Sequence, residues 1–296
     1  MKNIEKISRE KIFIENARIE TIESHPGEQF IFRIKSPKCA QNSIPGNFIH
    51  ITCDKKIPMR RPLSIMRANA EQGWIEVLFK IVGDGLQALS KKEIGDILNS
   101  MGPIGNGFKL SPNRPKIILI GGGVGIPPVI FLAETLKNNL KSLQPIVFMG
   151  SEIPFPFETA ETTMSNRWLP KNINHTMPLL ESWGIPGVLS SLSNFTGTYR
   201  GYVHEVVDKY LSSLPKEDLS KIQMFSCGPT PMLKEVSYIA SKYHLPCQIA
   251  LEEYMACAVG GCAGCTVMIH TQEGKSMKRV CVDGPVFEAS SVFPAV

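Results

Sequence analysis

The hydrophobic residues of this chain follow one pattern in its first third and another pattern beyond it. In the first part, short segments rich in β-branched and aromatic residues are separated by glycine, proline, asparagine and aspartate, which predicts strands joined by turns. The predicted strands are residues 11–20, 30–34, 48–52, 63–67 and 74–82, and a short helix or turn is expected over 90–97 before a further strand. Frequent short strands favour an antiparallel β-barrel or sandwich.

From residue 116 onward, the pattern changes to buried strands that alternate with helices. Continuous apolar runs predict strands at 116–120, 145–149 and 222–226, and helical spacing predicts helices at 128–140, 202–211 and 231–243. Such alternation indicates parallel βαβ units. Residues 151–200 are rich in proline, threonine, serine and asparagine and give no clear prediction.

These patterns divide the chain into three expected units, as suits a length of 296 residues. We expect an antiparallel β-barrel domain over 1–112, an α/β parallel-sheet domain over 113–250 and a small C-terminal module over 251–296. Residues 111–115 contain two prolines and no periodic pattern, and they are expected to link the first two units.

Composition and charge exclude several classes of protein. A hydrophobic content of 43% with 20% charged residues argues against disorder, and the net charge of +5 is spread along the chain, so a nucleic-acid partner is not expected. Residues 1–10 lack the apolar core of a secretory signal, and no run of about 18 apolar residues occurs, so we expect a cytoplasmic protein without a membrane partner. A reducing compartment argues against disulfides among the eight cysteines.

Four of those cysteines form a motif near the C-terminus. Cys257, Cys262 and Cys265 have the C-x4-C-x2-C spacing of plant-type ferredoxins, and Cys281 follows after 15 intervening residues. Glycine and alanine between the thiols would let backbone N–H groups approach the sulfurs of a [2Fe–2S] cluster. Two alternatives stay open, a structural zinc site and buried thiols without a metal.

Two motifs in the first unit suit a flavin. Arg61 begins the segment Arg-Pro-Leu-Ser, where an arginine fork could bind a pyrophosphate and Ser64 could bond a ring nitrogen. An exposed arginine at a strand edge would explain the same residues. Gly83 and Gly85 could bring backbone amides close to a phosphate, and a hairpin turn is the alternative.

Two motifs in the second unit suit a nicotinamide dinucleotide. Each follows a predicted buried strand, and the first opens a helix whose N-terminus would face the pyrophosphate. The second is a turn by default, or a platform beside the nicotinamide. The candidate residues are Gly121, Gly122, Gly123 and Gly125 in the first motif and Cys227, Gly228 and Pro229 in the second. Glu152, with no arginine near it in the sequence, favours NAD over NADP.

In this order, the motifs resemble the ferredoxin–NADP reductase superfamily over nearly the whole chain. The segments around Cys257 and Cys281 are similar to the iron–sulfur electron-transfer subunit of NAD-linked bacterial dihydroorotate dehydrogenases. The resemblance implies that the first domain binds FAD and the second binds NAD. It implies that the cluster ligands are Cys257, Cys262, Cys265 and Cys281, and that the flavin residues are Arg61, Pro62, Leu63, Ser64, Leu78, Phe79, Lys80, Gly85 and Leu86.

The resemblance also implies an oxidoreductase subunit that works in pyrimidine biosynthesis. A catalytic FMN-containing dihydroorotate dehydrogenase partner, in a heterotetramer, would supply electrons singly to the [2Fe–2S] cluster, and FAD would pass them as a hydride to NAD. Two positions depart from the pattern. Leu63 replaces the superfamily's aromatic residue, and Leu86 replaces the family's threonine, which leaves only a backbone amide for the flavin.

Two other functions stay open at this point. A related reductase subunit that serves ferredoxin, a hydrogenase or a sulfur-reducing enzyme would share every motif. A non-enzymatic redox sensor would have no need of the segments Gly121–Pro128 and Arg61–Ser64.

Overall fold

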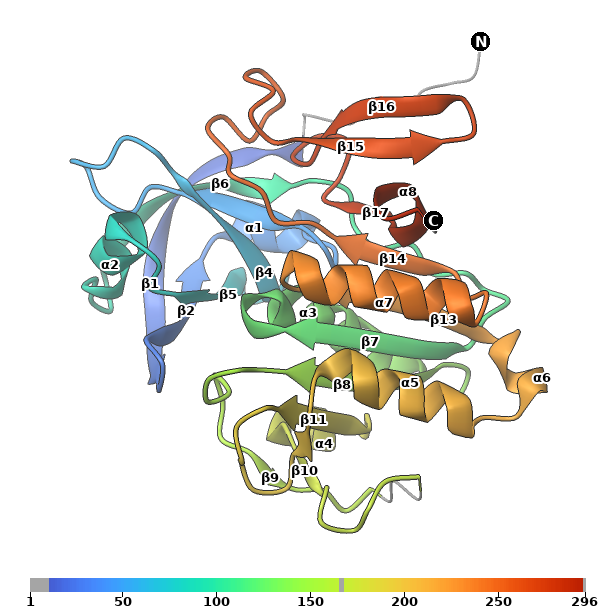
Figure 1. Ribbon diagram of the computed structural model, residues 1–296. Helices are drawn as coiled ribbons and strands as arrows, with labels where there is room; N and C mark the ends of the chain where they lie inside the picture. Colours follow the sequence, from blue (N-terminus) through green and yellow to red (C-terminus); the bar gives the residue numbers. More distant parts are fainter. Residues whose placement is uncertain (1–10, 165–167, 295–296) are drawn as a thin grey trace.

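A closed six-stranded antiparallel barrel forms the first part of the computed structural model, which describes residues 11–164 and 168–294. The strands follow the order β1-β2-β5-β4-β3-β6 around the barrel (Figure 1). Their bounds are β1 Phe13–His25, β2 Gln29–Lys35, β3 Phe48–Ile51, β4 Arg61–Asn69, β5 Trp74–Lys80 and β6 Ile97–Ile104. Two short helices, α1 (Pro37–Asn42) and α2 (Asp84–Ser90), interrupt this sequence of strands.

Alternation along the strands explains the barrel core. Ile49, Leu63 and Phe79 point inward and belong to one buried apolar cluster. The rings of Phe32 and Phe79 meet edge to face, with centroids 5.0 Å apart. Closure removes the exposed strand edges that an open sheet would leave.

The second part is a seven-stranded sheet in the order β12-β11-β8-β7-β13-β14-β17. All neighbouring strands are parallel except β14 and β17, which are antiparallel. The strands are β7 (Lys116–Gly122), β8 (Gln144–Gly150), β11 (Gly187–Ser191), β12 (Tyr199–Arg200), β13 (Ile222–Cys227), β14 (Cys247–Ala250) and β17 (Val286–Glu288).

Helices cover both faces of this sheet. In Figure 1, α5 and α7 lie in front of the sheet and α3 lies behind it, against the barrel. The helices are α3 (Ile126–Leu136), α4 (Pro178–Ser182), α5 (Val203–Ser213), α6 (Lys216–Leu219) and α7 (Thr230–Lys242), with 3-10 turns η2 (Gly123–Gly125) and η3 (Lys137–Asn139). The two short strands β9 (Ala160–Glu161) and β10 (His175–Thr176) pair beside them.

The C-terminal residues form a hairpin and then return to the large sheet. Strands β15 (Thr266–Thr271) and β16 (Gly274–Arg279) pair antiparallel and project at the top of Figure 1. Strand β17 then adds to the sheet edge beside β14, and the short helix α8 (Ala289–Val292) packs on α7. The cluster motif therefore lies in a segment that is anchored to the large sheet at both of its ends.

The structure confirms the predicted fold class, an antiparallel barrel followed by a parallel α/β sheet. Of the 90–97 segment, residues 91–96 form a turn, as one of the two expectations had it, while Ser90 ends α2 and Ile97 begins β6. Residues 151–200, which gave no prediction, contain the strand β11, which lies between β12 and β8 near one edge of the sheet. Within the described residues, no helix is long and apolar enough to cross a membrane. The expectation about residues 1–10 lies outside the described residues.

Candidate functional site

Arg61 and Gly85 meet at one end of the barrel. Arg61 opens β4, and its guanidinium lies so close to Gly85 in the first turn of α2 that an added Cβ would be 2.8 Å from Cζ. Gly83, just before that helix, has a φ of 115° and open space around it. The glycine pair therefore starts a helix instead of a hairpin, and the arginine and the backbone of this turn form a cradle suited to a phosphate.

Ser64 lies farther along β4, on the outer surface of the barrel. It is half-buried, and its hydroxyl forms no hydrogen bond with any residue in the described part of the chain, so it is free to bond a ligand. Pro62 shares this outer face, and Lys80 is half-buried at the end of β5. These are the predicted flavin residues whose side chains can reach a cofactor outside the barrel.

The other predicted flavin residues are buried in hydrophobic cores. Leu63, Phe79 and Leu86 pack inside the barrel, and Leu78 packs on its outer face against α3. Only their backbone groups can therefore contact a flavin. For Leu86, whose position departs from the threonine that the resemblance implies, the barrel core accounts for the leucine side chain.

The two predicted nicotinamide motifs lie side by side at the carboxyl ends of β7 and β13. Gly121 pairs with Cys227, and a Cβ on Gly125 would be 2.5 Å from the Cys227 carbonyl carbon. Gly123 has a φ of 53° and nothing within 4 Å of an added Cβ. This is the edge where open α/β sheets bind ligands, and the helix α3 begins directly after the motif.

One acidic residue near this edge was not predicted. Glu252 follows β14, and burial raises the pKa of its carboxyl group although the residue is accessible at the surface. Burial raises the pKa of the Cys227 thiol well above its usual range, and the charge of Glu252 raises it further. Cys227 is therefore a neutral thiol. Glu252 belongs to the segment before Cys257 that carries the family resemblance, but no role was predicted for it.

The four cysteines of the cluster motif come together as two pairs. The Sγ atoms of Cys265 and Cys281 are 3.3 Å apart and buried. Across the same loop, Cys257 Sγ accepts hydrogen bonds from the N–H groups of Gly261 at 3.3 Å and Cys262 at 3.4 Å. Among the residues that the structure describes, no three metal-binding side chains lie together as one set of ligands.

The backbone of this loop suits a cluster. Gly260 has a φ of 81°, Ala258 and Ala263 each have a φ of 55°, and a Cβ on Gly260 would be 2.5 Å from Val282. These positive φ values turn N–H groups toward the sulfurs, as hydrogen bonds to cluster thiolates require. An all-thiolate donor set is the one that [2Fe–2S] clusters use.

The pKa values of two of these thiols diverge. Burial by itself would raise the pKa of the Cys257 thiol, but backbone N–H groups, those of Val259 and Cys262 foremost, lower it to about 6. Burial, with the neighbouring Cys265 thiol, raises the pKa of Cys281 to about 12. The loop thus already stabilises one thiolate, the form that binds iron.

Phe48 on β3 connects the flavin face to the cysteine loop, and the motifs revealed neither this residue nor His50 on the same strand. Phe48 pairs with Ser64 and lies in one buried cluster with Cys265 and Cys281. His50 pairs with Pro62 and is fully buried, and neither ring nitrogen has a hydrogen-bond partner among the described residues. Burial foremost, and then the charge of Arg60, lower the pKa of His50 to about 4.

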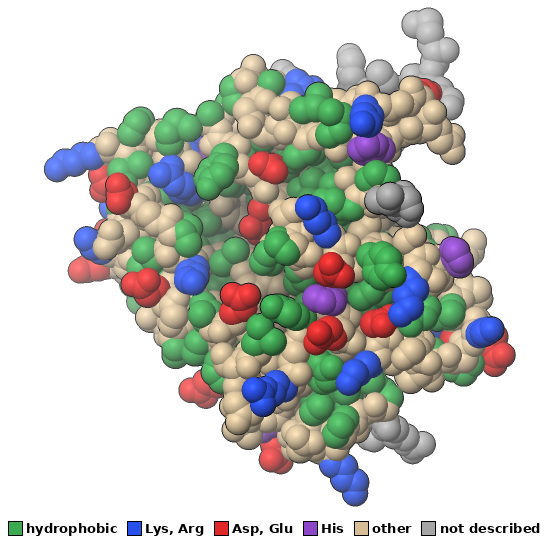
Figure 2. All heavy atoms as spheres, in the orientation of Figure 1, with side chains coloured by type: hydrophobic (Ala, Val, Ile, Leu, Met, Phe, Trp, Pro, Cys, Tyr) green, Lys and Arg blue, Asp and Glu red, His purple; other side chains and the backbone are tan. Residues whose placement is uncertain are grey.

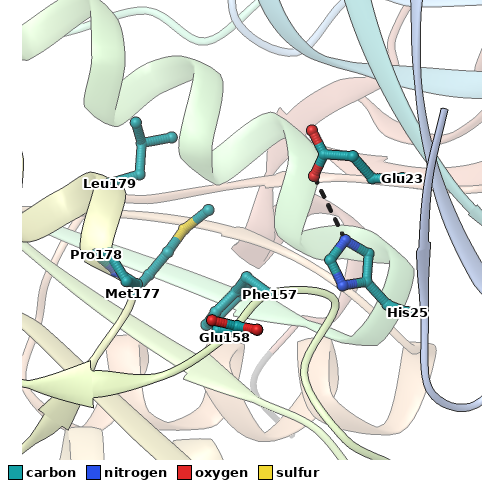
Figure 3. Close-up of a pocket in the computed structure, with 7 residues that line it drawn as sticks. All are labelled: Glu23, His25, Phe157, Glu158, Met177, Pro178 and Leu179. Atoms are coloured by element: carbon teal, nitrogen blue, oxygen red, sulfur yellow. Dashed lines mark ion pairs between the residues drawn. The ribbon is translucent and has the colours of Figure 1, made fainter. Parts of the chain in front are cut away.

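A cavity of about 400 Å³ lies elsewhere, between the β1–β2 turn and the segment after β8 (Figure 3). Glu23 and His25 come from the barrel, 3.6 Å apart, while Phe157, Glu158 and Met177 come from the sheet domain. None of the predicted cofactor residues lines it. It is a gap between the two domains and separate from the candidate site.

Two family models match separate parts of the chain. The model of the oxidoreductase FAD-binding domain matches residues 17–108. The model of the iron–sulfur cluster binding domain of dihydroorotate dehydrogenase B matches residues 252–293. The electron transfer subunit of dihydroorotate dehydrogenase B (NAD(+)) from Caldanaerobacter subterraneus is 33% identical over 249 residues, which cover 84% of this chain and 86% of the relative.

The chain belongs to the family of dihydroorotate dehydrogenase B electron transfer subunits. The subunit from Streptococcus mutans is 31% identical, over 83% of this chain and 86% of its own length. A solved NADH-dependent reduced ferredoxin–NADP oxidoreductase shares the fold, with a TM-score of 0.74, 24% identity and coverage of 94% of this chain and 90% of the other. The family assignment, the FAD-binding domain and the iron–sulfur domain predicted from the sequence are thereby confirmed.

Proposed function

We propose that this chain passes electrons from a catalytic dihydroorotate dehydrogenase partner, through a [2Fe–2S] cluster and FAD, to NAD in pyrimidine biosynthesis. The observation that carries the proposal is the position of Phe48, which joins the flavin face to the cysteine loop in a chain of this family. Electron transfer between two cofactors requires that they be held close together, and this contact would hold them so.

The chemistry comes from the cofactors, and the protein supplies binding and orientation. When bound, the cluster exchanges single electrons and the flavin exchanges a hydride with nicotinamide. Arg61 and the Gly85 backbone would bind the flavin pyrophosphate, and the Ser64 hydroxyl would bond a ring nitrogen. Cys257, Cys262, Cys265 and Cys281 would bind the irons. Gly121–Gly125 and Cys227–Pro229 would bind NAD, since open space remains above Gly123.

The exposed side of the cysteine loop supports electron entry from a partner. Cys262 is exposed, and Tyr254, just before the loop, is 94% exposed. Figure 2 shows further hydrophobic side chains over the top of the molecule, where the hairpin β15–β16 lies. Apolar groups around an exposed cluster loop suit a protein interface. The partner is proposed to be an FMN-containing catalytic subunit in a heterotetramer.

A preference for NAD over NADP is part of the proposal. Glu152 follows β8 at the sheet edge, is exposed, and would repel a 2′-phosphate. The relatives are named for NAD(+).

Coexpression with a catalytic dihydroorotate dehydrogenase of the same family tests the function. We expect the two chains to copurify and to form orotate and NADH from dihydroorotate and NAD. The Cys262→Ser variant of this chain, in the same complex, should lose this activity while NADH still reduces the flavin. Failure to copurify, together with rapid reduction of ferredoxin by NADH, would favour the related ferredoxin-linked subunit instead.

A further inference from the structure

A chain of charged side chains crosses from the barrel to helix α3. Glu76 on β5 is buried, with 4% of its surface exposed, and it accepts from two arginines. Arg33 Nη2 lies 2.6 Å from Glu76 Oε1, and Arg67 Nη1 lies 3.4 Å from Glu76 Oε2. Arg67 Nη2 also donates to Glu134 Oε1 on α3 at 2.9 Å, and Lys137 Nζ lies 3.3 Å from the same oxygen.

Arg67 is the residue of this group that reaches both domains. It lies on β4, the strand that carries Arg61 and Ser64, three positions beyond the serine. Glu134 lies on α3, which begins at Ile126 directly after the glycines of the nicotinamide motif. A single ion pair therefore ties the strand of the flavin site to the helix of the nicotinamide site.

Two tryptophans surround the same guanidinium. Arg67 Cζ is 5.5 Å from the ring centroid of Trp74 on β5 and 5.8 Å from that of Trp183, which follows α4 in the sheet domain. Arg33 stacks on Trp74 alone, at 4.1 Å. The side chain of Arg67 is thus held between groups of the two domains, whereas Arg33 stays within the barrel.

Apolar side chains around this ion pair hold the barrel and α3 together but do not fix their relative orientation. Met66 and Leu78 of the barrel pack in one buried cluster with Val129 and Ile130 of α3. Apolar burial is non-directional, so these side chains would tolerate small shifts of the helix. A planar guanidinium that bonds two carboxylates fixes both the distance and the angle between the elements that carry those carboxylates.

We propose that Arg67 is a positioning residue for hydride transfer between flavin and nicotinamide, through its bridge to Glu134. This inference rests on the proposed function for the identity of the reactants, whereas the bridge between Arg67 and Glu134 is independent of that function. By fixing α3 against β4, the bridge sets the separation of the two cofactor sites. A displacement of about 1 Å can slow such a reaction about 100-fold.

The network offers a clean substitution. If Arg67 is removed, Glu76 keeps Arg33 and Glu134 keeps Lys137, so neither carboxylate loses its last cation. Arg67→Met preserves much of the apolar stem. Arg33→Met is the matched control. It also removes a guanidinium that contacts Glu76 and Trp74, but this guanidinium has no contact with α3.

The test measures FAD reduction by NADH in anaerobic stopped-flow experiments. We expect Arg67→Met to lower the limiting rate at saturating NADH by about 10-fold or more and to weaken the flavin–nicotinamide charge-transfer band, while FAD content and the dissociation constant of NADH change less than about 2-fold. Arg33→Met should keep the wild-type rate and band. Arg67→Lys, which keeps one charge for Glu134, should recover part of the rate and replaces Arg67→Met if that variant does not fold.

Hydrogen exchange gives a second readout that needs no turnover. In Arg67→Met, the amides of Gly121–Gly125 and of the first turn of α3 should exchange several-fold faster than in Arg33→Met. The inference would be overturned if the two variants had the same limiting rate of FAD reduction and the same amide exchange, whether both matched the wild type or both were impaired equally. Wild-type protein that does not oxidise NADH would refute the proposed function, while the exchange comparison would still decide the role of Arg67.

Discussion

Phe48 lies directly opposite Ser64 in the barrel, and on the same face it packs against the cysteines of the C-terminal loop. Opposite residues of an antiparallel pair share one face of the sheet, so the flavin serine and the cluster module meet across this phenylalanine. The contact joins residues more than 200 positions apart in the chain.

Phe48→Ala should therefore loosen the cluster module. Phe48 is 4% exposed, and truncation of a buried phenylalanine costs about 3 kcal/mol or more of unfolding free energy. We expect iron content to fall more than FAD content, as measured on purified protein. In the control Phe32→Ala, which creates its cavity inside the barrel, FAD should be lost first. The opposite order in the two variants would contradict this role.

Cys262→Ser should remove the cluster without removing the flavin. Cys262 is exposed, so the substitution leaves the hydrophobic cores intact. We expect the iron content and the cluster absorbance to be lost, while NADH still bleaches the flavin at about the wild-type rate. Cys247→Ala, at a buried thiol in β14 outside the motif, should keep its iron. If flavin reduction disappears with the cluster in a folded Cys262→Ser protein, the proposed separation of roles is wrong.

Gly125→Ala should impair the nicotinamide site selectively. Its Cβ would be 2.5 Å from the Cys227 carbonyl carbon, so the two nicotinamide motifs would have to move apart. We expect the affinity for NADH to drop about 10-fold or more, with FAD and iron retained, because this distortion is confined to the sheet edge. Gly261→Ala, whose Cβ would meet only the Cys257 sulfur at 4.0 Å, should keep wild-type NADH affinity.

His50 should make the protein less stable in acid. Its pKa is lowered to about 4 in the folded chain, below the usual 6.5, because burial and the charge of Arg60 disfavour the cation. Between these two pH values only the unfolded chain takes up the proton, so stability falls as the pH drops from about 6.5 to 4, by up to about 3 kcal/mol. Chemical denaturation across this range measures the loss. His50→Leu should reduce the slope, and an unchanged slope would show that other groups cause it.

Local sequence patterns were sufficient for most of the fold. The β-branched and aromatic residues of β2 and β5, bounded by turn residues, and the apolar runs of β7 and β13 identify these segments as strands. Strand β11 was missed because Gly187–Ser191 is short and ends in two serines that are buried only by tertiary contacts. Strand β17 pairs with β14 across the whole cluster module, a relationship that no local pattern reveals.

In the candidate site, too, local motifs could be predicted from the sequence and tertiary contacts could not. The spacing of Cys257, Cys262 and Cys265 is local and could be recognised at once. The roles of Phe48, His50 and Arg67 depend on which side chains meet after folding. Leu86 shows the reverse case, since only the structure reveals that its side chain belongs to the barrel core.

Analysis of iron, sulfide and flavin in protein purified without oxygen tests the central claim most directly, when it is combined with electron paramagnetic resonance after addition of NADH. The account predicts two irons and two acid-labile sulfides for each FAD, and a rhombic signal of a reduced [2Fe–2S] cluster that disappears in Cys262→Ser. Protein that binds zinc in place of iron, or a cluster that NADH cannot reduce while the flavin is bleached, would contradict it.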